Sequence, residues 1–383
     1  MSDKYDYWLH HLPGVGERTI RKLLAVYRKP EEIYERLISQ GAGKAAGRQE
    51  FEGILTGKQK EALSAHTKKW KLGEEYEKLA EAGIQFVTFQ EPLYPQRLKE
   101  IPDPPFGLYV RGGLPQDNVL SVAVIGAREC SEYGRFVGQE LGKALGKKGV
   151  QVISGMARGI DGISQAAALD AGGVSFGVLG CGVDICYPSQ NKRLYERLLV
   201  QGGILSPYVP GTMPKAPLFP PRNRIVSGLA DALIVVEARQ KSGTLITVDM
   251  ALEQGREVYV VPGRLTDRLS DGCNRLIKQG AAILLSPEDF LAEIADNFPD
   301  KLHPCDISGP VMRNRVELPL NEEEHKIYCN VDLTPKTVEQ ICKESHTKLS
   351  YLQVQQILMK LCLAGAVKQP VPGFYACHRE NCS

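Results

Sequence analysis

The sequence predicts an α/β protein built around a doubly wound parallel sheet, with a helical segment before the sheet and a segment of helices and a hairpin after it. Two observations predict this fold. Short apolar segments without polar alternation take turns with helical segments through the middle of the chain, which is typical of parallel strands buried on both faces. The chain also has 383 residues, which favours two or three domains over a single core.

The middle of the chain carries the clearest pattern. We expect a doubly wound domain over residues 119–296, because helical segments separate the apolar ones all along it. The expected strands are 121–126, 150–154, 174–179, 232–237, 257–261 and 281–285. The expected helices are 131–147, 160–171, 190–201, 222–230, 243–254 and 272–279.

Residues 1–65 predict a small helical domain. Leu12-Pro13-Gly14-Val15-Gly16 has the form of the turn in a helix-hairpin-helix motif, and apolar residues follow it at helical spacing: Ile20, Leu23, Leu24 and Tyr27. In that motif the hairpin amides contact DNA phosphates, but small helical domains also use the turn for packing, and both interpretations stay open. Residues 66–118 are expected to join this domain to the core through a helix (62–82), a strand (84–89) and a Pro-rich connector (91–118).

The C-terminal part of the chain predicts a winged-helix domain over residues 319–383, after a polar, Pro-containing linker at 297–318. Thr334 and Pro335 are expected to open a helix that ends at Glu344, and a second helix follows at 350–363. A hairpin of 367–371 and 374–376 completes the pattern. The second helix would present Gln353, Gln355, Gln356 and Lys360, which is poor in phosphate-binding cations and favours protein binding or plain capping of the fold.

Composition excludes several classes of protein. Hydrophobic residues make up 43% and charged residues 24%, which excludes a disordered chain, a collagen and a coiled coil. No apolar segment approaches the roughly 20 residues that span a bilayer, and the first residues lack the features of a signal peptide, so we expect a cytoplasmic protein with no membrane partner. The net charge of +2 implies that any nucleic acid is bound through a local basic patch.

The cysteines do not predict a metal centre. Ten are scattered along the chain without a Cys-x-x-Cys pair. Cys181/Cys186 and Cys377/Cys382 are close in sequence, and His378 adjoins the second pair. Zinc requires four converging ligands and only three are local here, so we expect reduced thiols, no metal site and no cofactor.

Three loops are expected to meet at the carboxyl edge of the sheet, where open α/β folds bind ligands. They are residues 126–128 (GAR), 154–161 (SGMARGID) and 242–244 (SGT). Glycines allow a ligand close to the backbone, helix N-termini direct amides outward, and Arg128 and Arg158 add charge, so the loops together predict an anion site. None is a Walker A or Gly-x-Gly-x-x-Gly loop, and the glycines taken singly are also consistent with tight turns.

The stretch 213–224 (MPKAPLFPPRNR) predicts a strand-binding loop. No acidic residue lies between Glu196 and Asp231, while the stretch holds Lys215, Arg222 and Arg224. We expect its prolines to keep it extended and Phe219 to stack on a base among these cations, as in single-strand binding proteins. The alternative is a crossover whose Phe packs inward and whose arginines pair with Asp231 or Glu237.

No catalytic residues are predicted. The three loops hold no Ser-His-Asp set, no pair of metal ligands and no obvious nucleophile, and His303 falls in the linker. Asp161, Asp184, Glu237 and Asp249 are candidate carboxylates, but none is a convincing catalytic base, and Asp161 is better placed to cap or orient the second loop.

Five ordered motifs resemble the DNA-processing protein A (DprA/Smf) family. They are residues 122–128 (VAVIGAR), 154–161 (SGMARGID), 219–224 (FPPRNR), 242–247 (SGTLIT) and 261–263 (VPG), and their order and spacing match over about 84–290. The resemblance implies a Rossmann-like domain that carries the DNA site, no enzymatic activity and a homodimer. It also implies a role in natural transformation, in which the protein binds and protects incoming single-stranded DNA and loads the RecA recombinase onto it.

The resemblance and the loops together define one set of candidate residues. Asp161 is expected to orient the second loop. The expected DNA-binding residues are Gly126, Arg128, Ser154, Gly155, Arg158, Gly159, Lys215, Phe219, Arg222, Asn223, Arg224, Ser242, Gly243 and Thr244. The chain departs from the family's usual residues at Ala127, Gln165 and Pro207, which affects the polar network of the pocket rather than its anion-binding rim.

Two other functions remain as alternatives to a single-strand-binding recombination mediator. The first is an enzyme acting on nucleotide-derived small molecules, since the domain more distantly resembles Rossmann-like phosphoribohydrolases. In that family a glutamate stands at the position of Thr247, so the carboxylate it uses is missing here. The second is a transcription regulator that reads duplex DNA with its C-terminal segment, against which the uncharged second helix of that segment counts.

Overall fold

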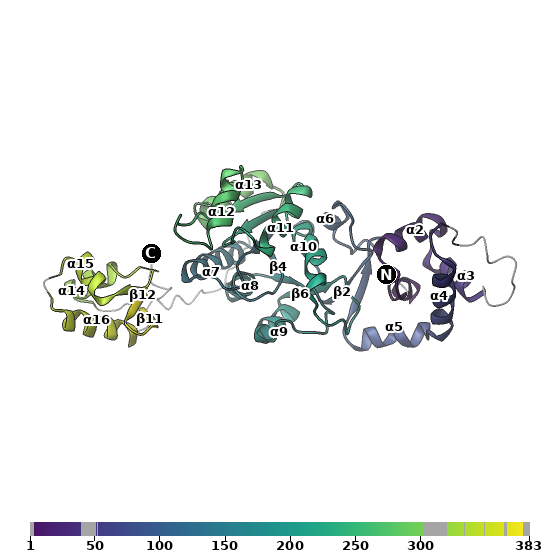
Figure 1. Cartoon of the computed structure of the whole chain (residues 1–383), viewed down its shortest axis with the longest axis horizontal. Coiled ribbons are helices and arrows are strands. Elements are labelled where there is room, and N and C mark those ends of the chain that lie inside the picture. Colours follow the sequence, from purple (N-terminus) through teal and green to yellow (C-terminus); the bar gives the residue numbers. More distant parts are fainter. Residues whose placement is uncertain are drawn as a thin grey trace. The chain divides into compact units, whose positions relative to one another are not determined.

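Figure 1 shows the chain as a computed structural model, which describes residues 4–39, 51, 53–301, 320–332, 334–347, 349–363 and 366–377. The chain divides into two compact units, one of Met1–Glu129 and Gly138–Cys305 and the other of Cys130–Val137 and Asp306–Ser383. None of the described helices is long and apolar enough to cross a membrane.

A nine-stranded sheet forms the centre of the described part of the first unit, with the order β1-β2-β6-β5-β4-β3-β7-β8-β9. Strands β3 to β9 are parallel to one another, and β1 and β2 add an antiparallel edge. The strands are β1 (Gln85–Thr88), β2 (Gly107–Gly112), β3 (Ser121–Ile125), β4 (Gln151–Ser154), β5 (Ser175–Val178), β6 (Gly202–Ser206), β7 (Ala232–Val235), β8 (Glu257–Val260) and β9 (Ala282–Ile283). The α/β class with a mostly parallel sheet is therefore confirmed.

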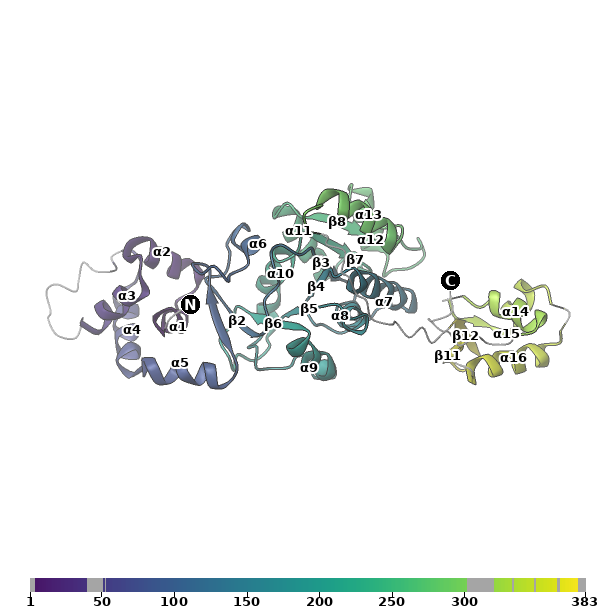
Figure 2. The ribbon, with the colours of Figure 1, turned by 180° about the vertical axis from the view of Figure 1, so that it is seen from behind.

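Helices cover both faces of this sheet (Figures 1 and 2). They are α6 (Gln96–Lys99), α7 (Glu132–Lys147), α8 (Ile160–Asp170), η2 (Ser189–Asn191), α9 (Lys192–Val200), η3 (Ala216–Leu218), α10 (Phe219–Gly228), α11 (Gly243–Glu253), α12 (Asp271–Lys278) and α13 (Pro287–Asn297). One apolar cluster joins α8 and α9 to the sheet, and another joins α10, α11 and α12 to it. From β3 the chain steps through β4, β5 and β6 in one direction and then returns to place β7 beside β3. The direction of winding therefore reverses between β3 and β7, which is where a doubly wound sheet leaves a crevice.

In the first unit, strands β2 and β6 and helices α6 and α13 were absent from the sequence prediction. Strand β6 begins with Gly202 and Gly203, which weaken the strand signal but are required by packing. A Cβ at Gly202 would lie 1.8 Å from the Ser175 carbonyl oxygen, and one at Gly203 would lie 1.9 Å from the Gly113 carbonyl oxygen. Strand β2 lies inside the segment predicted to be a Pro-rich connector, and helix α13 follows the last predicted strand.

The N-terminal part of the first unit contains α1 (Lys4–His10), α2 (Glu17–Tyr27), α3 (Pro30–Ser39), α4 (Gly57–Lys69) and α5 (Leu72–Glu81). The single helix predicted over 62–82 is wrong, because the backbone leaves the helical conformation at Trp70 and α5 starts anew. The predicted turn before α2 contains Gly14 at a φ of +71°, a conformation that favours glycine.

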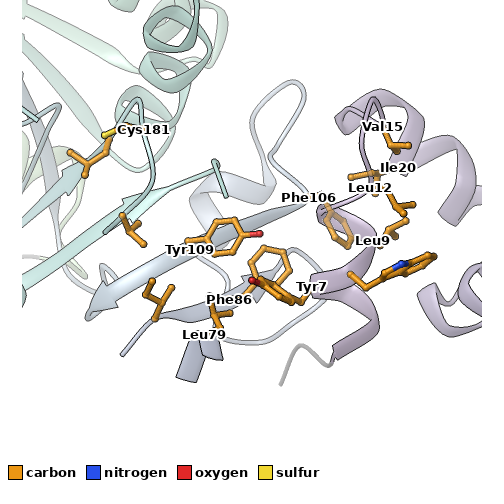
Figure 3. Packing of buried hydrophobic residues seen from close by; sticks show 14 of the residues in the cluster. Tyr7, Leu9, Leu12, Val15, Ile20, Leu79, Phe86, Phe106, Tyr109 and Cys181 are labelled. Atoms are coloured by element: carbon orange, nitrogen blue, oxygen red, sulfur yellow. The ribbon is translucent and has the colours of Figure 1, made fainter. Parts of the chain in front are cut away.

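Aromatic rings join these helices to the antiparallel edge of the sheet (Figure 3). The ring of Phe86 in β1 lies 6.1 Å from that of Tyr7 in α1 and 4.7 Å from that of Tyr109 in β2. Helix α2 adds polar contacts, since the Glu17 carboxylate accepts a hydrogen bond from the Phe106 amide at 2.7 Å and Arg21 pairs with Asp103 at 2.7 Å. The side chains at the start of α2 are thus engaged in packing within the protein.

Besides the start of α7, the described part of the second unit contains three helices and a three-stranded antiparallel sheet. The elements are α14 (Glu322–Cys329), β10 (Lys336–Thr337), α15 (Val338–Glu344), α16 (Tyr351–Leu363), β11 (Val367–Val371) and β12 (Phe374–Cys377). The predicted N-cap Thr334 is wrong: Thr337 caps α15, where it exchanges hydrogen bonds with Gln340, because residues 336–337 pair with β12. Of the predicted linker, 302–318 lies outside the described residues.

A buried ion pair fastens the connector to the central sheet. Arg97 of α6 and Asp231 before β7 are both 4% exposed, and the Arg97 Nε lies 3.2 Å from Asp231 Oδ1. The other Arg97 nitrogens donate to the Ser121 hydroxyl and to the carbonyl oxygens of Asp117 and Val119, among others. Asp231 Oδ2 in turn accepts the Ser121 amide at 2.9 Å. The pair therefore holds α6 against the amino ends of β3 and β7.

Asp231→Asn should destabilise the chain by about 3–5 kcal/mol, because it leaves the Arg97 charge buried without its counter-ion. Urea unfolding followed by circular dichroism measures this change. Asp170→Asn is the matched control, since its pair with Arg197 is on the surface and is worth about 1 kcal/mol or less. Equal costs for the two variants would contradict the structural role given to the buried pair.

The stability of the N-terminal helices should fall as pH falls from about 6.5 to about 4. Burial lowers the pKa of His11 to about 4. Its ring is neutral in the fold at pH values where the unfolded chain already takes up a proton, so stability is complete above the ordinary pKa and is lost below it. The only two tryptophans, Trp8 and Trp70, lie beside this region, so their fluorescence reports its unfolding. The variant His11→Asn should show a shallower decline, and an unchanged pH profile would contradict this assignment.

Candidate functional site

Three loops lie in contact at the carboxyl edge of the parallel strands. The loop after β3 accepts hydrogen bonds from both neighbours: the Ile160 amide donates to the Ala127 carbonyl at 3.2 Å, and the Thr244 hydroxyl donates to the Gly126 carbonyl at 3.4 Å. Gly159 is at a φ of +74°, and a Cβ there would lie 2.2 Å from the Ala127 oxygen. The glycine at this position is therefore required for the loops to approach each other.

A cavity of about 710 Å³ lies over these loops, at the point where the winding reverses. It is lined by ten of the candidate residues: Gly126, Arg128, Gly155, Asp161, Phe219, Arg222, Asn223, Ser242, Gly243 and Thr244. A second cavity of about 410 Å³ shares Arg128, Phe219 and Arg222 with the first and adds Arg158. The structure thus brings most of the candidate set together around two adjoining cavities.

Four candidates do not line either cavity. Ser154 is buried and donates a hydrogen bond to the Val124 carbonyl at 2.7 Å. Gly159 holds the loops together as described above. Lys215 is exposed between two lining residues, and the Arg224 Nε donates back to the Pro221 carbonyl at 3.2 Å. These side chains are beside the cavities or beneath them rather than in their walls.

The extended conformation predicted for 213–224 is wrong from Ala216 onward, and the helix predicted to begin at residue 222 begins three residues earlier. Phe219 begins helix α10, and the two prolines that follow occupy its first turn. Proline is tolerated there because the first amides of a helix have no partner within it, and its fixed φ suits the helix. The helix orients Phe219 and Arg222, one turn apart, toward the same loops.

Phe219 forms a wall shared by the two cavities. The guanidinium of Arg128 lies 5.6 Å from the centre of its ring, and that of Arg222 lies 5.8 Å from it. The ring of Tyr187 is 5.8 Å away at an angle of 34°. A Cβ at Gly180 would lie 2.7 Å from the Phe219 ring, so the glycine leaves room for it. The phenyl ring is thus held in place with two guanidinium groups over it.

Arg222 is buried and its guanidinium bonds to the protein. Nη1 donates to the Gly155 carbonyl at 2.8 Å and to the Val178 carbonyl, while Nε has no hydrogen-bond partner. Asp161 is its electrostatic partner, and the Asp161 carboxylate also accepts the Gly155 amide at 3.1 Å. Burial raises the pKa of Asp161 although the Arg222 charge opposes the shift, and burial lowers the pKa of Arg222. Both side chains therefore bond to the second loop at Gly155.

Among the lining side chains that the candidate set missed are two cations and one aromatic ring. Arg239 and Lys241 lie between β7 and α11, directly before the third predicted loop, and Tyr187 lies between β5 and α9. The sequence did offer an indication of Arg239 and Lys241, because both closely follow a predicted strand, as Arg128 does. Lys241 is adjacent to Ser242, whose hydroxyl accepts the Thr244 amide and caps α11.

Hydrogen bonds within the protein engage Gln165, which departs from the family's usual residue, and Ser206, which precedes the departure at Pro207. Gln165 is fully buried: its Oε1 accepts the Met156 amide at 3.2 Å, and its Nε2 donates to the Ser175 hydroxyl and the Phe176 carbonyl, both at 3.1 Å. Ser206, before Pro207, donates to the Cys181 carbonyl at 2.6 Å. Each polar atom named here is satisfied, so these residues support the loops from below.

Among the cysteines and the polar side chains of α16 that the structure describes, Cys186 alone lines either cavity, and some of the groups singled out in the sequence lie outside the described residues. Cys181 and Cys186 are free thiols, and no group of three or more His, Cys, Asp or Glu side chains in the described part converges to hold a metal. His378 and Cys382 lie outside the described residues. On α16, Gln353, Gln356 and Lys360 are exposed and Gln355 is half-buried, and Lys360 pairs with Glu324 at 2.5 Å.

Comparison with known proteins gives a consistent result. Residues 85–295 match the family model described as DNA recombination-mediator protein A. DNA processing protein DprA of Streptococcus pneumoniae is 42% identical over 55% of this chain and 74% of its own length. Protein Smf of Escherichia coli is 38% identical over 79% of this chain and 80% of its own length.

Two solved structures are similar in fold and in sequence. The X-ray structure of the S. pneumoniae protein covers 76% of this chain and 98% of its own, with a TM-score of 0.63 and 32% identity. A structure of DNA processing protein A from Helicobacter pylori, described by its single-stranded DNA binding mode, covers 56% of this chain and 98% of its own, with a TM-score of 0.51 and 30% identity. With its Rossmann-like sheet and a family match over more than half its length, this chain belongs to the DNA recombination-mediator protein A (DprA/Smf) family.

Proposed function

We propose that this protein binds single-stranded DNA in the cavity at the carboxyl edge of the sheet. The observation that carries the proposal is the pairing of Arg128 with Phe219, an exposed cation over a held aromatic ring, next to two helix N-termini. Phosphates suit the cation and the amides, and bases of any sequence suit the ring. The H. pylori relative with a described single-stranded DNA binding mode supports the same ligand.

The two adjoining cavities give the strand separate places for its backbone and a base. Phosphates lie at Arg128 and at the amides before α8 and α11, and Lys215 and Arg158 add charge at the margins. A base stacks on Phe219. Because the Arg128 guanidinium occupies one face of that ring, a base on this face displaces it, so binding involves a side-chain rearrangement.

The wider role that we propose follows the family. The protein protects incoming single-stranded DNA in the cytoplasm and loads the RecA recombinase onto it during natural transformation, as a homodimer. The second unit acts as a winged-helix domain, and its face on α16 favours a protein over DNA because it is rich in glutamine and apolar side chains.

We propose no catalytic activity for this site. The carboxylates that line the main cavity are Asp161, which is engaged with the Gly155 amide and Arg222, and Glu129, which is exposed at its margin. Thr247, at the position where the phosphoribohydrolases carry glutamate, lines the cavity without an acid group. Release of base or ribose phosphate from nucleoside monophosphates would support the rival enzyme and contradict this proposal.

Arg128→Ala and Phe219→Ala should each weaken binding of a labelled oligo-dT, measured by fluorescence anisotropy. Removing the stacking ring should cost about 1–3 kcal/mol, or roughly 5- to 150-fold in affinity, at all salt concentrations. Removing the cation should also make the salt dependence less steep by about 0.7 in the log–log slope. A duplex of equal length is the control ligand, and wild-type binding without a single-strand preference would contradict the proposed function.

Arg222→Met should act first on stability, since it leaves Asp161 buried without a counter-ion and two carbonyls without a donor. We expect a loss of about 3–5 kcal/mol in urea unfolding, whereas Arg128→Ala should change stability by no more than about 0.5 kcal/mol. A stable Arg222→Met variant with wild-type unfolding would contradict the positioning role of this side chain.

A further inference from the structure

The described part of the second unit contains a groove of about 540 Å³ between the start of α14 and one side of α16. Helix α14 contributes Glu322, Glu323 and Glu324 to its walls, and α16 contributes Gln353, Gln356 and Lys360. None of these residues lines the two cavities at the carboxyl edge of the large sheet. The groove is therefore a feature that the binding of single-stranded DNA does not explain.

The groove has an excess of negative charge, since three carboxylates and one ammonium group line it. Lys360 pairs with Glu324 at 2.5 Å, and this contact lowers the pKa of Glu324. Lys326 pairs with Glu323 at 3.5 Å from outside the groove. Glu322 is exposed, and no side-chain hydrogen bond or ion pair involves it among the described residues. One carboxylate of the groove is thus available to a cation of a partner.

Apolar side chains lie beside this groove on the outward side of α16. Leu352, Met359 and Leu363 are 65%, 57% and 92% exposed, and we call them the apolar row. Their spacing of i, i+7 and i+11 places them on one face of the helix. Gln356 lies four residues after Leu352 and three before Met359, so it shares that face, and it also lines the groove. The apolar row therefore borders the groove.

The apolar row is not part of the core of its own unit. Val354, Leu358 and Leu361 of the same helix are buried in one cluster with Ile327 of α14 and Ile341 of α15. Helix α16 thus carries apolar side chains on two sides, and the described part of the unit covers only one of them. A partner that covers the other side removes apolar surface from water, which favours association.

The charges near the apolar row disfavour nucleic acid as the partner. A winged helix that binds DNA directs free cations toward the phosphates. Here Lys326, Lys336 and Lys360 are each paired with a carboxylate, and Glu322 adds a negative charge. A phosphate backbone that runs along α16 therefore meets charge of its own sign.

The same charges disfavour a second copy of this chain on the apolar row. A two-fold contact places a surface patch against the same patch of the other copy. Two antiparallel α16 helices joined at the apolar row bring one acidic groove toward the other, and like charges that face each other across an interface oppose association. A partner with basic side chains meets attraction at this groove instead.

We propose that the apolar row and the groove together dock an amphipathic helix of a protein partner, a helix with lysine or arginine beside its apolar face. Its apolar side chains pack on Leu352, Met359 and Leu363, and one of its cations pairs with Glu322. The apolar row is about 16 Å long, so a partner helix of about three turns covers it. This inference rests on the proposed protein-binding role of the second unit and gives the chemistry of the partner, and it does not depend on where DNA binds.

The test uses the full chain, without DNA, and two designed helical peptides that carry a fluorophore. Each peptide has about 15 residues, which is about four helical turns, with leucines along one face. One peptide carries lysines beside the leucines, and the other carries glutamates at the same positions. In fluorescence anisotropy the lysine peptide should bind saturably, and the glutamate peptide should bind about tenfold or more weakly.

Two variants and a matched control assign the binding to this surface. Leu352→Ser/Met359→Ser should weaken binding of the lysine peptide about tenfold or more, because apolar anchors carry most of the affinity of such a contact. Glu322→Lys should weaken it about three- to tenfold at low salt and less at high salt, since this charge is exposed. Val200→Ser/Leu252→Ser changes two exposed apolar residues of the first unit and should bind as the wild type does. Urea unfolding midpoints equal to that of wild type show that the variants are folded.

Several outcomes overturn this inference. They are no binding of the lysine peptide to wild type, equal binding of the two peptides, and undiminished binding of the lysine peptide to Leu352→Ser/Met359→Ser. Binding of duplex DNA that is lost in this variant assigns the surface to nucleic acid. A dimer mass in light scattering that is lost in this variant assigns it to a second copy of the chain.

Binding of oligo-dT separates this inference from the DNA-binding proposal. If wild type binds oligo-dT but not the lysine peptide, the docking surface is overturned and the DNA-binding proposal stands. If wild type binds the lysine peptide but not oligo-dT, the DNA-binding proposal fails and the docking surface stands. Leu352→Ser/Met359→Ser should bind oligo-dT as the wild type does.

Discussion

The arrangement of the candidate site depends on one buried electrostatic contact, that of Arg222 with Asp161 around Gly155. Arg222 comes from α10, Asp161 from α8 and Gly155 from the end of β4, so a single cluster joins two helices on different faces to the sheet edge between them. A Cβ at Gly155 would lie 2.6 Å from an Arg222 nitrogen and 2.8 Å from an Asp161 oxygen. The absence of a side chain at Gly155 is what permits the contact, and the contact in turn fixes where Phe219 stands.

This arrangement divides the cations of the site into two kinds. Arg222 is buried and satisfied mainly by carbonyls and a carboxylate, so it holds the loop in place. Arg128, Arg239 and Lys241 are exposed and have no acidic partner in the described part of the chain. Although the net charge of the chain is only +2, these cations produce a local positive electrostatic potential near the helix N-termini.

Sequence reasoning reached the sheet and the three loops because parallel strands and glycine-rich turns leave strong local signals. Strand β6 was not predicted because its first two residues are glycines. Gly202 and Gly203 leave room for the carbonyl oxygens of Ser175 and Gly113, which are distant in the sequence, so no local pattern indicates them. The start of α10 was placed three residues late, because the prolines before residue 222 were interpreted as part of an extended loop. Arg222 was assigned to phosphate because burial of a guanidinium depends on tertiary contacts. Lys241 was not included among the candidate residues because the third loop was defined to begin at Ser242.

The exposed cations of the site also carry an electrostatic cost that an anion in the cavity would offset. The Arg128 charge contributes to lowering the pKa of Arg222, which means that the two guanidinium groups repel each other in the free protein. Protein carboxylates do not offset this repulsion fully, since Asp161 is the one buried acid in the lining and Glu129 is exposed at the margin. A phosphate placed between the cations supplies the missing negative charge. Binding and stability are therefore linked through the same groups, so a polyanion that occupies the cavity stabilises the loops that receive it.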